Sequence, residues 1–158
     1  MDTNATSPLN LDEDNAWRAL TYVANHLVKT LADDLAADSP LSLSQYVALV
    51  HLSEATDAQL RIGDLAQAVG LSPSRMSRVI DQMASDGLVS KKVLDDDARC
   101  TYAVMTDKGL RALQAAYPLQ LRNVRRRVFD HLSVDEIQVL GRALGKVCTG
   151  LDQRLPIR

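Results

Sequence analysis

Apolar residues recur along the first part of the chain at alternating intervals of three and four positions. They are Trp17, Leu20, Ala24, Leu27 and Leu31. This spacing places them on one face of a helix, which we expect over about residues 14–37, before the Ser39-Pro40 pair. Residues 1–10 are polar, contain Pro8 and lack the pattern, so we expect a disordered tail there.

Shorter helices with recognisable ends are predicted next. Ser42 and Gln45 have the spacing of a capping box at the start of a second helix. A third helix over residues 62–69 is expected to stop at Gly70, because glycine readily takes the left-handed backbone conformation that ends helices.

The fourth helix has the clearest start signal in the chain. Ser72 is a good N-cap and Pro73 suits the first helical position, so this helix should run to about Ser85. Two strands are then predicted over residues 88–94 and 99–105, joined by an acidic turn. A short helix, a glycine-containing turn and a capped helix are typical of a helix-turn-helix, and the hairpin would be its wing.

Two more helices complete the pattern, over about residues 107–152. Thr106 is expected to cap the fifth helix, and Ser133 with Glu136 forms a capping box for the sixth. The sixth helix carries an apolar face made of Ile137, Leu140, Leu144, Val147 and Leu151. Such stripes need a partner surface, either within the monomer or on a second subunit. We favour a homodimer, because the middle of the chain already makes a small core of its own.

These elements define the expected fold class. It is mainly α with a small β-hairpin wing: a winged helix-turn-helix over about residues 42–106, flanked by N- and C-terminal dimerisation helices, in one domain over residues 11–158.

The charge of the chain is unevenly distributed. The net charge is −2, but residues 1–60 carry nine acidic and two basic side chains, whereas residues 61–127 carry seven acidic and twelve basic ones. A basic second half suits a phosphate-facing surface. No long apolar run and no secretory signal is present, so we expect a cytoplasmic protein without a membrane partner.

Nothing in the sequence predicts an enzyme, a cofactor or a metal site. There is no glycine-rich phosphate loop and no recognisable set of nucleophile and base. His26, His51 and His131 lie on separate segments without ligand spacing, and Cys100 and Cys148 form no paired motif. Cys100 would lie in the wing, either as a small strand residue or as a redox switch.

The exposed face of the fourth helix is the main candidate for DNA recognition. At about 100° per residue, its apolar residues fall on one side, and the other side carries Ser74, Arg75, Ser77, Arg78 and Gln82. Arginine pairs with guanine, glutamine with adenine, and serine with bases or phosphates. The free amides after Ser72 favour a phosphate. An ordinary solvated helix face is the alternative.

Several motifs resemble the MarR family of winged helix-turn-helix regulators. Asp97-Ala98-Arg99, followed by Met105-Thr106 and Gly109, is similar to the family's wing signature, with methionine where the family has leucine. Further similar segments are Leu43–Tyr46, Ile62–Ala66, Leu71–Ser74 and Gly87–Val89. The resemblance covers about residues 14–152.

The resemblance implies a homodimeric regulator, expected to be a repressor, that binds double-stranded DNA at a pseudo-palindromic promoter site and is released by a small molecule. By position, Arg99 would enter the minor groove at the wing tip, and Lys91 and Lys92 would face phosphates. In relatives, aromatic acids often bind between the dimerisation helices and the winged-helix lobe. The resemblance therefore implies Arg18 as a carboxylate partner, with His26 and His51 as neighbours; a surface residue on an acidic helix is the alternative for Arg18.

Three alternatives stay open. The arginine cluster on the fifth helix (Arg122, Arg125, Arg126 and Arg127) would touch flanking DNA or pair with the acidic N-terminal region of a second subunit. The whole chain could instead be a winged-helix module that binds protein and not DNA. A small-molecule enzyme on a helical scaffold is the third, which the missing catalytic set disfavours.

Overall fold

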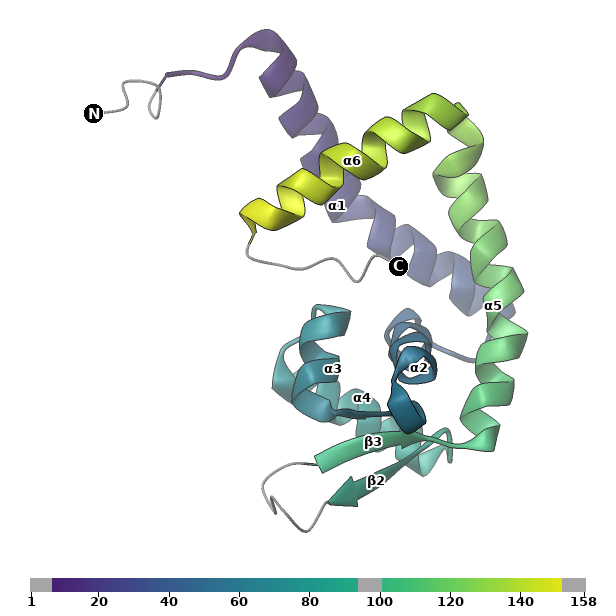
Figure 1. Cartoon of the computed structure of the whole chain (residues 1–158). Helices are drawn as coiled ribbons and strands as arrows, with labels where there is room; N and C mark the ends of the chain where they lie inside the picture. The colour runs from purple at the N-terminus through teal and green to yellow at the C-terminus, as the bar shows by residue number, and fades with distance from the viewer. Residues whose placement is uncertain (1–6, 94–100, 152–158) are drawn as a thin grey trace. The chain divides into compact units, whose positions relative to one another are not determined.

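The computed structural model describes residues 7–93 and 101–151 of the chain (Figure 1). Their helices are α1 (Leu11–Asp38), α2 (Leu43–Glu54), α3 (Ile62–Val69), α4 (Pro73–Ser85), α5 (Asp107–Arg127) and α6 (Val134–Gly150). The short 3-10 turn η1 (Thr56–Ala58) leads from α2 into strand β1 (Gln59–Arg61), and η2 (Phe129–His131) lies between α5 and α6. Strands β2 (Val89–Val93) and β3 (Thr101–Met105) lie between α4 and α5 in the sequence. This mainly helical fold with a small wing confirms the predicted class.

Local capping chemistry explains most helix boundaries. The predicted capping boxes at Ser42 and Ser133 are both present. The first helix starts three residues before the predicted position of about 14, because α1 begins at Leu11, directly after the polar segment over residues 1–10. Asn10 accepts a hydrogen bond from the backbone N–H of Glu13 at 3.0 Å, and the Glu13 carboxylate accepts one from the N–H of Asn10 at 2.9 Å. This third capping box fixes the start of the helix.

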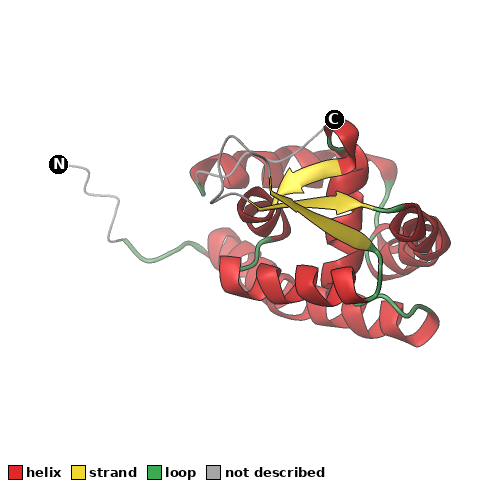
Figure 2. Cartoon of the chain, turned by 90° about the horizontal axis from the view of Figure 1, so that it is seen from below, coloured by secondary structure: helices red, strands yellow, loops and turns green. Residues whose placement is uncertain are grey.

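The sheet has one strand more than the sequence predicted. The predicted hairpin is β2 with β3, and β1 pairs with the other edge of β3, giving the antiparallel order β1-β3-β2 (Figure 2). In this register Leu60, Ala103 and Lys91 form one cross-strand row, and Arg61, Tyr102 and Lys92 form the next. Since neighbouring residues of a strand point to opposite faces, these two rows lie on opposite faces of the sheet.

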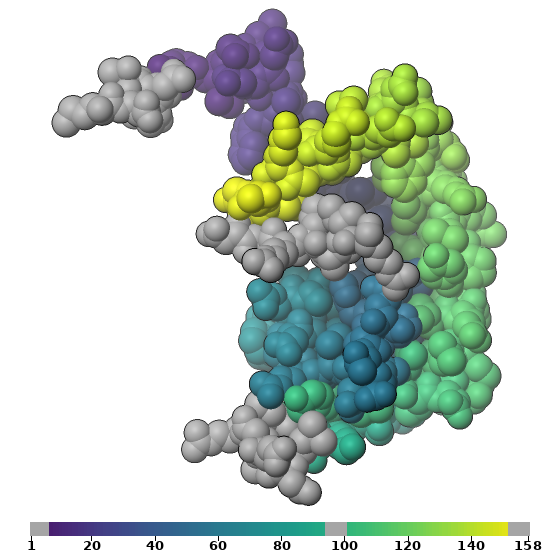
Figure 3. Space-filling model, in the orientation of Figure 1, coloured from purple at the N-terminus to yellow at the C-terminus, as the bar shows by residue number. Residues whose placement is uncertain are grey.

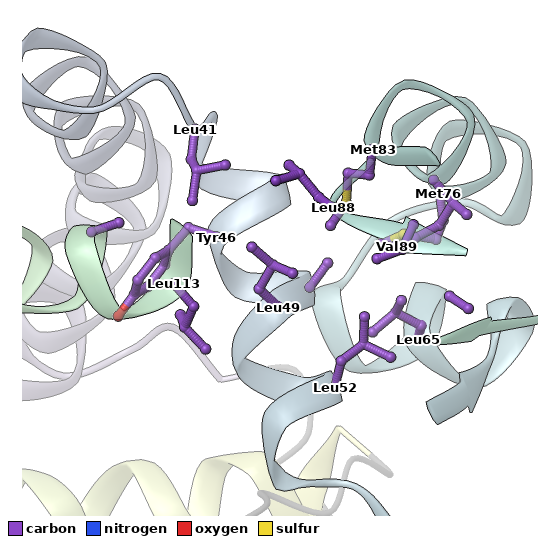
Figure 4. Close-up of a cluster of buried hydrophobic side chains, with 14 of the residues drawn as sticks. Leu41, Tyr46, Leu49, Leu52, Leu65, Met76, Met83, Leu88, Val89 and Leu113 are labelled. Carbon is purple, nitrogen blue, oxygen red and sulfur yellow. The ribbon is translucent and has the colours of Figure 1, made fainter. Parts of the chain in front are cut away.

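An aliphatic and methionine-rich core surrounds α2 and holds α3, α4 and the sheet around it (Figure 4). Its largest fully buried side chains are Leu35, Leu49, Leu52, Leu65, Met76, Ile80 and Met83. Ala103 is fully buried in the middle of β3, which identifies its face of the sheet as the core face. The core therefore fixes α4 and the wing as one body.

The chain divides after Gln120 into two compact units. In the second unit, no residue of α6 (yellow in Figure 3) is buried, and large apolar side chains along it are exposed. They are Val134, Val139, Leu140, Leu144 and Val147. In the first unit, α1 buries only Leu35 and exposes Trp17, Tyr22, Val23 and Val28. The single domain over residues 11–158 stays a prediction. Over the described ranges, no helix is long and apolar enough to cross a membrane.

Candidate nucleic-acid interface

The connection between α3 and α4 has the geometry of a tight helix-turn-helix. Gly70 ends α3 in the left-handed conformation, with φ 73° and ψ 31°. The N–H of Leu71 then donates to the carbonyl of Ala66 at 2.9 Å. Ser72 begins α4 by accepting a hydrogen bond from the N–H of Arg75 at 3.4 Å, and Pro73 occupies the first turn. Glycine suits this turn because other residues resist a positive φ.

The two faces of α4 are separated as the sequence predicted. Met76, Ile80 and Met83 are completely buried, and Val79 packs against the same core. On the other side Ser74, Arg75, Arg78 and Gln82 are exposed, and Ser77 is half-buried. Burial of one face fixes the rotation of the helix, so the remaining face consists almost entirely of hydrogen-bond donors.

The exposed side chains of α4 differ in the contacts that they make within the protein. The side-chain amide of Gln82 donates to the carboxylate of Asp86 at 3.1 Å, one turn further along the helix. The hydroxyls of Ser72 and Ser74 lie 3.3 Å apart. Among the residues that the structure describes, no carboxylate lies within ion-pair distance of Arg75 or Arg78. Both guanidinium groups are therefore available to an external acceptor.

The sheet register sends the two predicted wing lysines in opposite directions. Lys91 lies in the row of the buried Ala103, and its ammonium group forms an ion pair with Asp81 of α4. Lys92 lies in the next row, beside Tyr102, on the outer face of the sheet. Because the two lysine side chains leave opposite faces of the sheet, they could not both contact DNA phosphates from one face of the wing.

Arg61 is a basic residue that the sequence reasoning missed. Arg61 lies in β1, opposite Tyr102 of β3. Its Nε donates to the Tyr102 hydroxyl at 2.8 Å, and its guanidinium carbon is 5.6 Å from the centre of the tyrosine ring. Together with Lys92 it makes a basic row on the outer face. No local signal could have located it, because its partner strand lies 41 residues away in the sequence.

The end of β3 is joined to the end of α4 by the residues of the wing signature. The Thr106 hydroxyl donates to the carbonyl of Gly87 at 2.8 Å and accepts from the N–H of Gly109 at 3.1 Å. A Cβ atom on Gly109 would lie 2.2 Å from the carbonyl oxygen of Leu88, so only glycine fits there without a shift. Thr106 also caps α5, as predicted.

Two predicted wing residues cannot be placed. Arg99, expected at the wing tip, and Cys100 both lie outside the described residues.

Two of the predicted effector residues, Arg18 and His26, contact residues of their own helix. The Arg18 side chain is three-quarters exposed, and its Nε pairs with Asp14 of the same helix at 2.7 Å. His26 lies eight residues further along α1, about 12 Å in helical rise, and stacks on Tyr22 with ring centres 4.1 Å apart. His51 is half-buried on α2.

Two buried amides on α5 were also missed. Gln120 is 6% exposed and Asn123 is 2% exposed. The Gln120 Oε1 and Asn123 Nδ2 atoms have no hydrogen-bond partner within the described part of the chain. Most buried polar atoms in proteins pair with another protein group or with ordered water. The sequence did contain a signal for these two amides, because both are polar residues on the inner side of the predicted fifth helix.

Comparisons with known proteins agree with this geometry. Residues 41–101 match the model of the MarR family. AbsC, a MarR family transcriptional regulator from Streptomyces coelicolor, is 33% identical, with 93% of this chain and 99% of AbsC covered and a TM-score of 0.82. Sco3205, a MarR family regulator from the same organism solved in complex with DNA, is 29% identical, with 91% and 94% covered and a TM-score of 0.83.

A curated relative is similar over a shorter length. The transcriptional repressor MprA of Escherichia coli (strain K12) is 27% identical over 108 residues. This match covers 68% of the present chain and 61% of MprA, so the chain spans about three-fifths of that repressor's length. The likeness to AbsC over nearly the whole of both chains is decisive, and the chain belongs to the MarR family of transcriptional regulators.

Proposed function

We propose that this regulator is a repressor that binds a pseudo-palindromic DNA site as a homodimer and releases it when a small molecule binds. The observation that carries the proposal is the donor-rich exposed face of α4, fixed outward by the buried Met76, Ile80 and Met83. The DNA complex of Sco3205 supports DNA binding, and the name of MprA supports repression.

Base reading is assigned to the middle of the α4 face. Arg75 and Arg78 are suited to guanine because each guanidinium can donate two hydrogen bonds to the major-groove edge of that base. Ser74, Ser77 and Gln82 would supply further contacts to base edges. Gln82 would first have to leave Asp86, which it now contacts.

Backbone contacts are assigned to the helix start and to the wing. Ser72 and the free amides of the first turn would hold a phosphate, because a helix N-terminus favours negative charge. Lys92 and Arg61 would contact phosphates from the outer face of the sheet, and Arg99 would enter the minor groove.

Dimerisation through α1 and α6 would cover the exposed apolar side chains of both helices. Trp17 of α1 is 57% exposed, and Val147 of α6 is 44% exposed. Large apolar side chains repeated along a helix favour association with a second apolar surface. A twofold dimer would present two α4 helices to half-sites about one turn of DNA apart.

Release by a small molecule would depend on polar side chains of α1, α2 and α5. Arg18, His26 and His51 are the first residues to test as effector contacts, with Arg18 leaving Asp14 to bind a carboxylate. The unpartnered amide atoms of Gln120 and Asn123 give a second set of polar contacts to test.

A protein-binding winged helix without DNA recognition is the competing function. Protein interfaces are anchored by aromatic and large apolar side chains, whereas the α4 face displays serine, arginine and glutamine. The absence of an apolar anchor on α4 therefore favours DNA.

Selection from a pool of randomised duplexes tests the proposal. The full chain should enrich a pseudo-palindrome, and a mobility shift should then show tighter binding to this operator than to a scrambled duplex. The double variant Arg75→Ala/Arg78→Ala should lose that preference and keep its thermal stability. Equal binding of the wild-type chain to every duplex would contradict base reading.

A further inference from the structure

Asp81 places a carboxylate inside the DNA-facing surface of α4. On a helical wheel of about 100° per residue, Asp81 falls between Ser74 and Ser77, on the side opposite the buried residues. Its side chain is 59% exposed. A bare carboxylate at this position would repel phosphates, and it lies three residues after Arg78, close enough to compete for that guanidinium.

Lys91 reaches this carboxylate from the wing. Its row in the sheet contains the fully buried Ala103, so the Lys91 side chain leaves β2 on the face that packs against α4. There its Nζ pairs with Oδ1 of Asp81. Lys92, the next residue, points to the other face, and so only Lys91 can neutralise Asp81 from this strand.

The ion pair between Lys91 and Asp81 should matter more for DNA binding than for the stability of the fold. Both side chains are substantially solvent-exposed, at 39% for Lys91 and 59% for Asp81, and exposed ion pairs add little to stability. On the α4 surface, however, the pair cancels a negative charge beside the serines and keeps Arg78 available for bases.

We propose that Lys91 is a positioning residue of the recognition helix: it neutralises Asp81 and does not bind a DNA phosphate itself. This inference rests on the proposed function, because it assigns a role within the same DNA-binding surface. It also concerns specificity. A released carboxylate accepts a hydrogen bond from the amino group of cytosine, so loss of Lys91 should change base preference near Ser74.

The substitution Asp81→Asn distinguishes a Lys91 that neutralises Asp81 from a Lys91 that binds a DNA phosphate. Operator and scrambled-duplex affinities would be measured by fluorescence anisotropy at several salt concentrations for wild type, Lys91→Ala, Asp81→Asn and the double variant. Lys91→Ala should weaken operator binding by about tenfold through the exposed carboxylate. The double variant should regain wild-type affinity within about twofold, with a nearly unchanged salt slope, because no phosphate contact has been lost. Melting temperatures of all four proteins should agree.

Lys92 is the matched control, since it is the adjacent lysine on the opposite sheet face. Lys92→Ala should weaken both duplexes, reduce the salt slope by about one, and gain nothing from Asp81→Asn. A double variant as weak as Lys91→Ala, with the slope lowered by one, would overturn the proposal and make Lys91 a phosphate contact. An unchanged affinity of Lys91→Ala would overturn it as well. Failure of the wild-type chain to bind any DNA would instead refute the proposed function, and the neutralising role with it.

Discussion

Replacement of Arg78 by alanine should weaken binding to the operator much more than binding to random DNA. Arg78 is exposed, lies opposite the buried face of α4, and has no carboxylate within ion-pair distance among the residues described. Its full pairing capacity is therefore available to a base. Loss of one bidentate arginine–guanine pair costs about 1–3 kcal/mol. At 1.4 kcal/mol per factor of ten, this weakens operator binding by about 5- to 150-fold.

Fluorescence anisotropy with the operator and a scrambled duplex of the same composition measures the difference. Lys29→Ala is a charge control, because Lys29 lies on α1, is 80% exposed and pairs with Asp33. It should leave both affinities nearly unchanged. Arg78→Ala should also keep the wild-type melting temperature, since Arg78 lies outside the core. Equal weakening on both duplexes would refute the reasoning: Arg78 would then bind a phosphate, and specificity would rest on Ser74, Arg75, Ser77 or Gln82.

Three further predictions concern the close packing of Gly109 against Leu88, dimerisation, and effector binding. Gly109→Ala should lower the free energy of unfolding by about 1–3 kcal/mol, because its Cβ would lie 2.2 Å from the Leu88 carbonyl oxygen; an unchanged thermal or denaturant midpoint would contradict this. Light scattering should show a dimer at micromolar concentration that Leu144→Glu weakens, Leu144 being 37% exposed on α6; a variant as dimeric as wild type would exclude this part of α6 from the interface. Arg18→Ala should leave DNA affinity unchanged and reduce release by salicylate, used as the aromatic-acid probe; release equal to wild type would remove Arg18 from the effector site.

Features encoded within a few neighbouring residues could be predicted from the sequence. Ser42 with Gln45, Gly70, and Ser72 with Pro73 all fix helix ends through contacts no more than four residues away. The buried face of α4 was equally predictable, since its hydrophobic period is that of a helix. Asn10 with Glu13 had the same kind of signal, but it lies before the first apolar stripe residue and was overlooked.

Features that depend on strand register could not be predicted. Gln59–Arg61 is three residues long and becomes a strand only by pairing with Tyr102–Val104, so no local pattern marks it. Lys91 and Lys92 point to opposite faces in any strand, but the register of β2 with β3 decides which of them faces α4. A one-residue shift of β2 would exchange their faces. The sequence therefore identified the wing as basic without showing which lysine faces α4.

The residues that carried the family resemblance have a physical role, because they connect the end of α4 to the start of α5. Thr106 bonds both to Gly87, just after α4, and to Gly109, in the first turn of α5. Lys108 adds a second link, since its ammonium donates to the carbonyl of Asp86 at 2.6 Å. A displacement of the first turn of α5 must therefore move the residues that end α4 or break these hydrogen bonds. Because Met76, Ile80 and Met83 anchor α4 in the core as far as its last turn, such a displacement would act mainly on the residues that follow Met83 and on the start of β2.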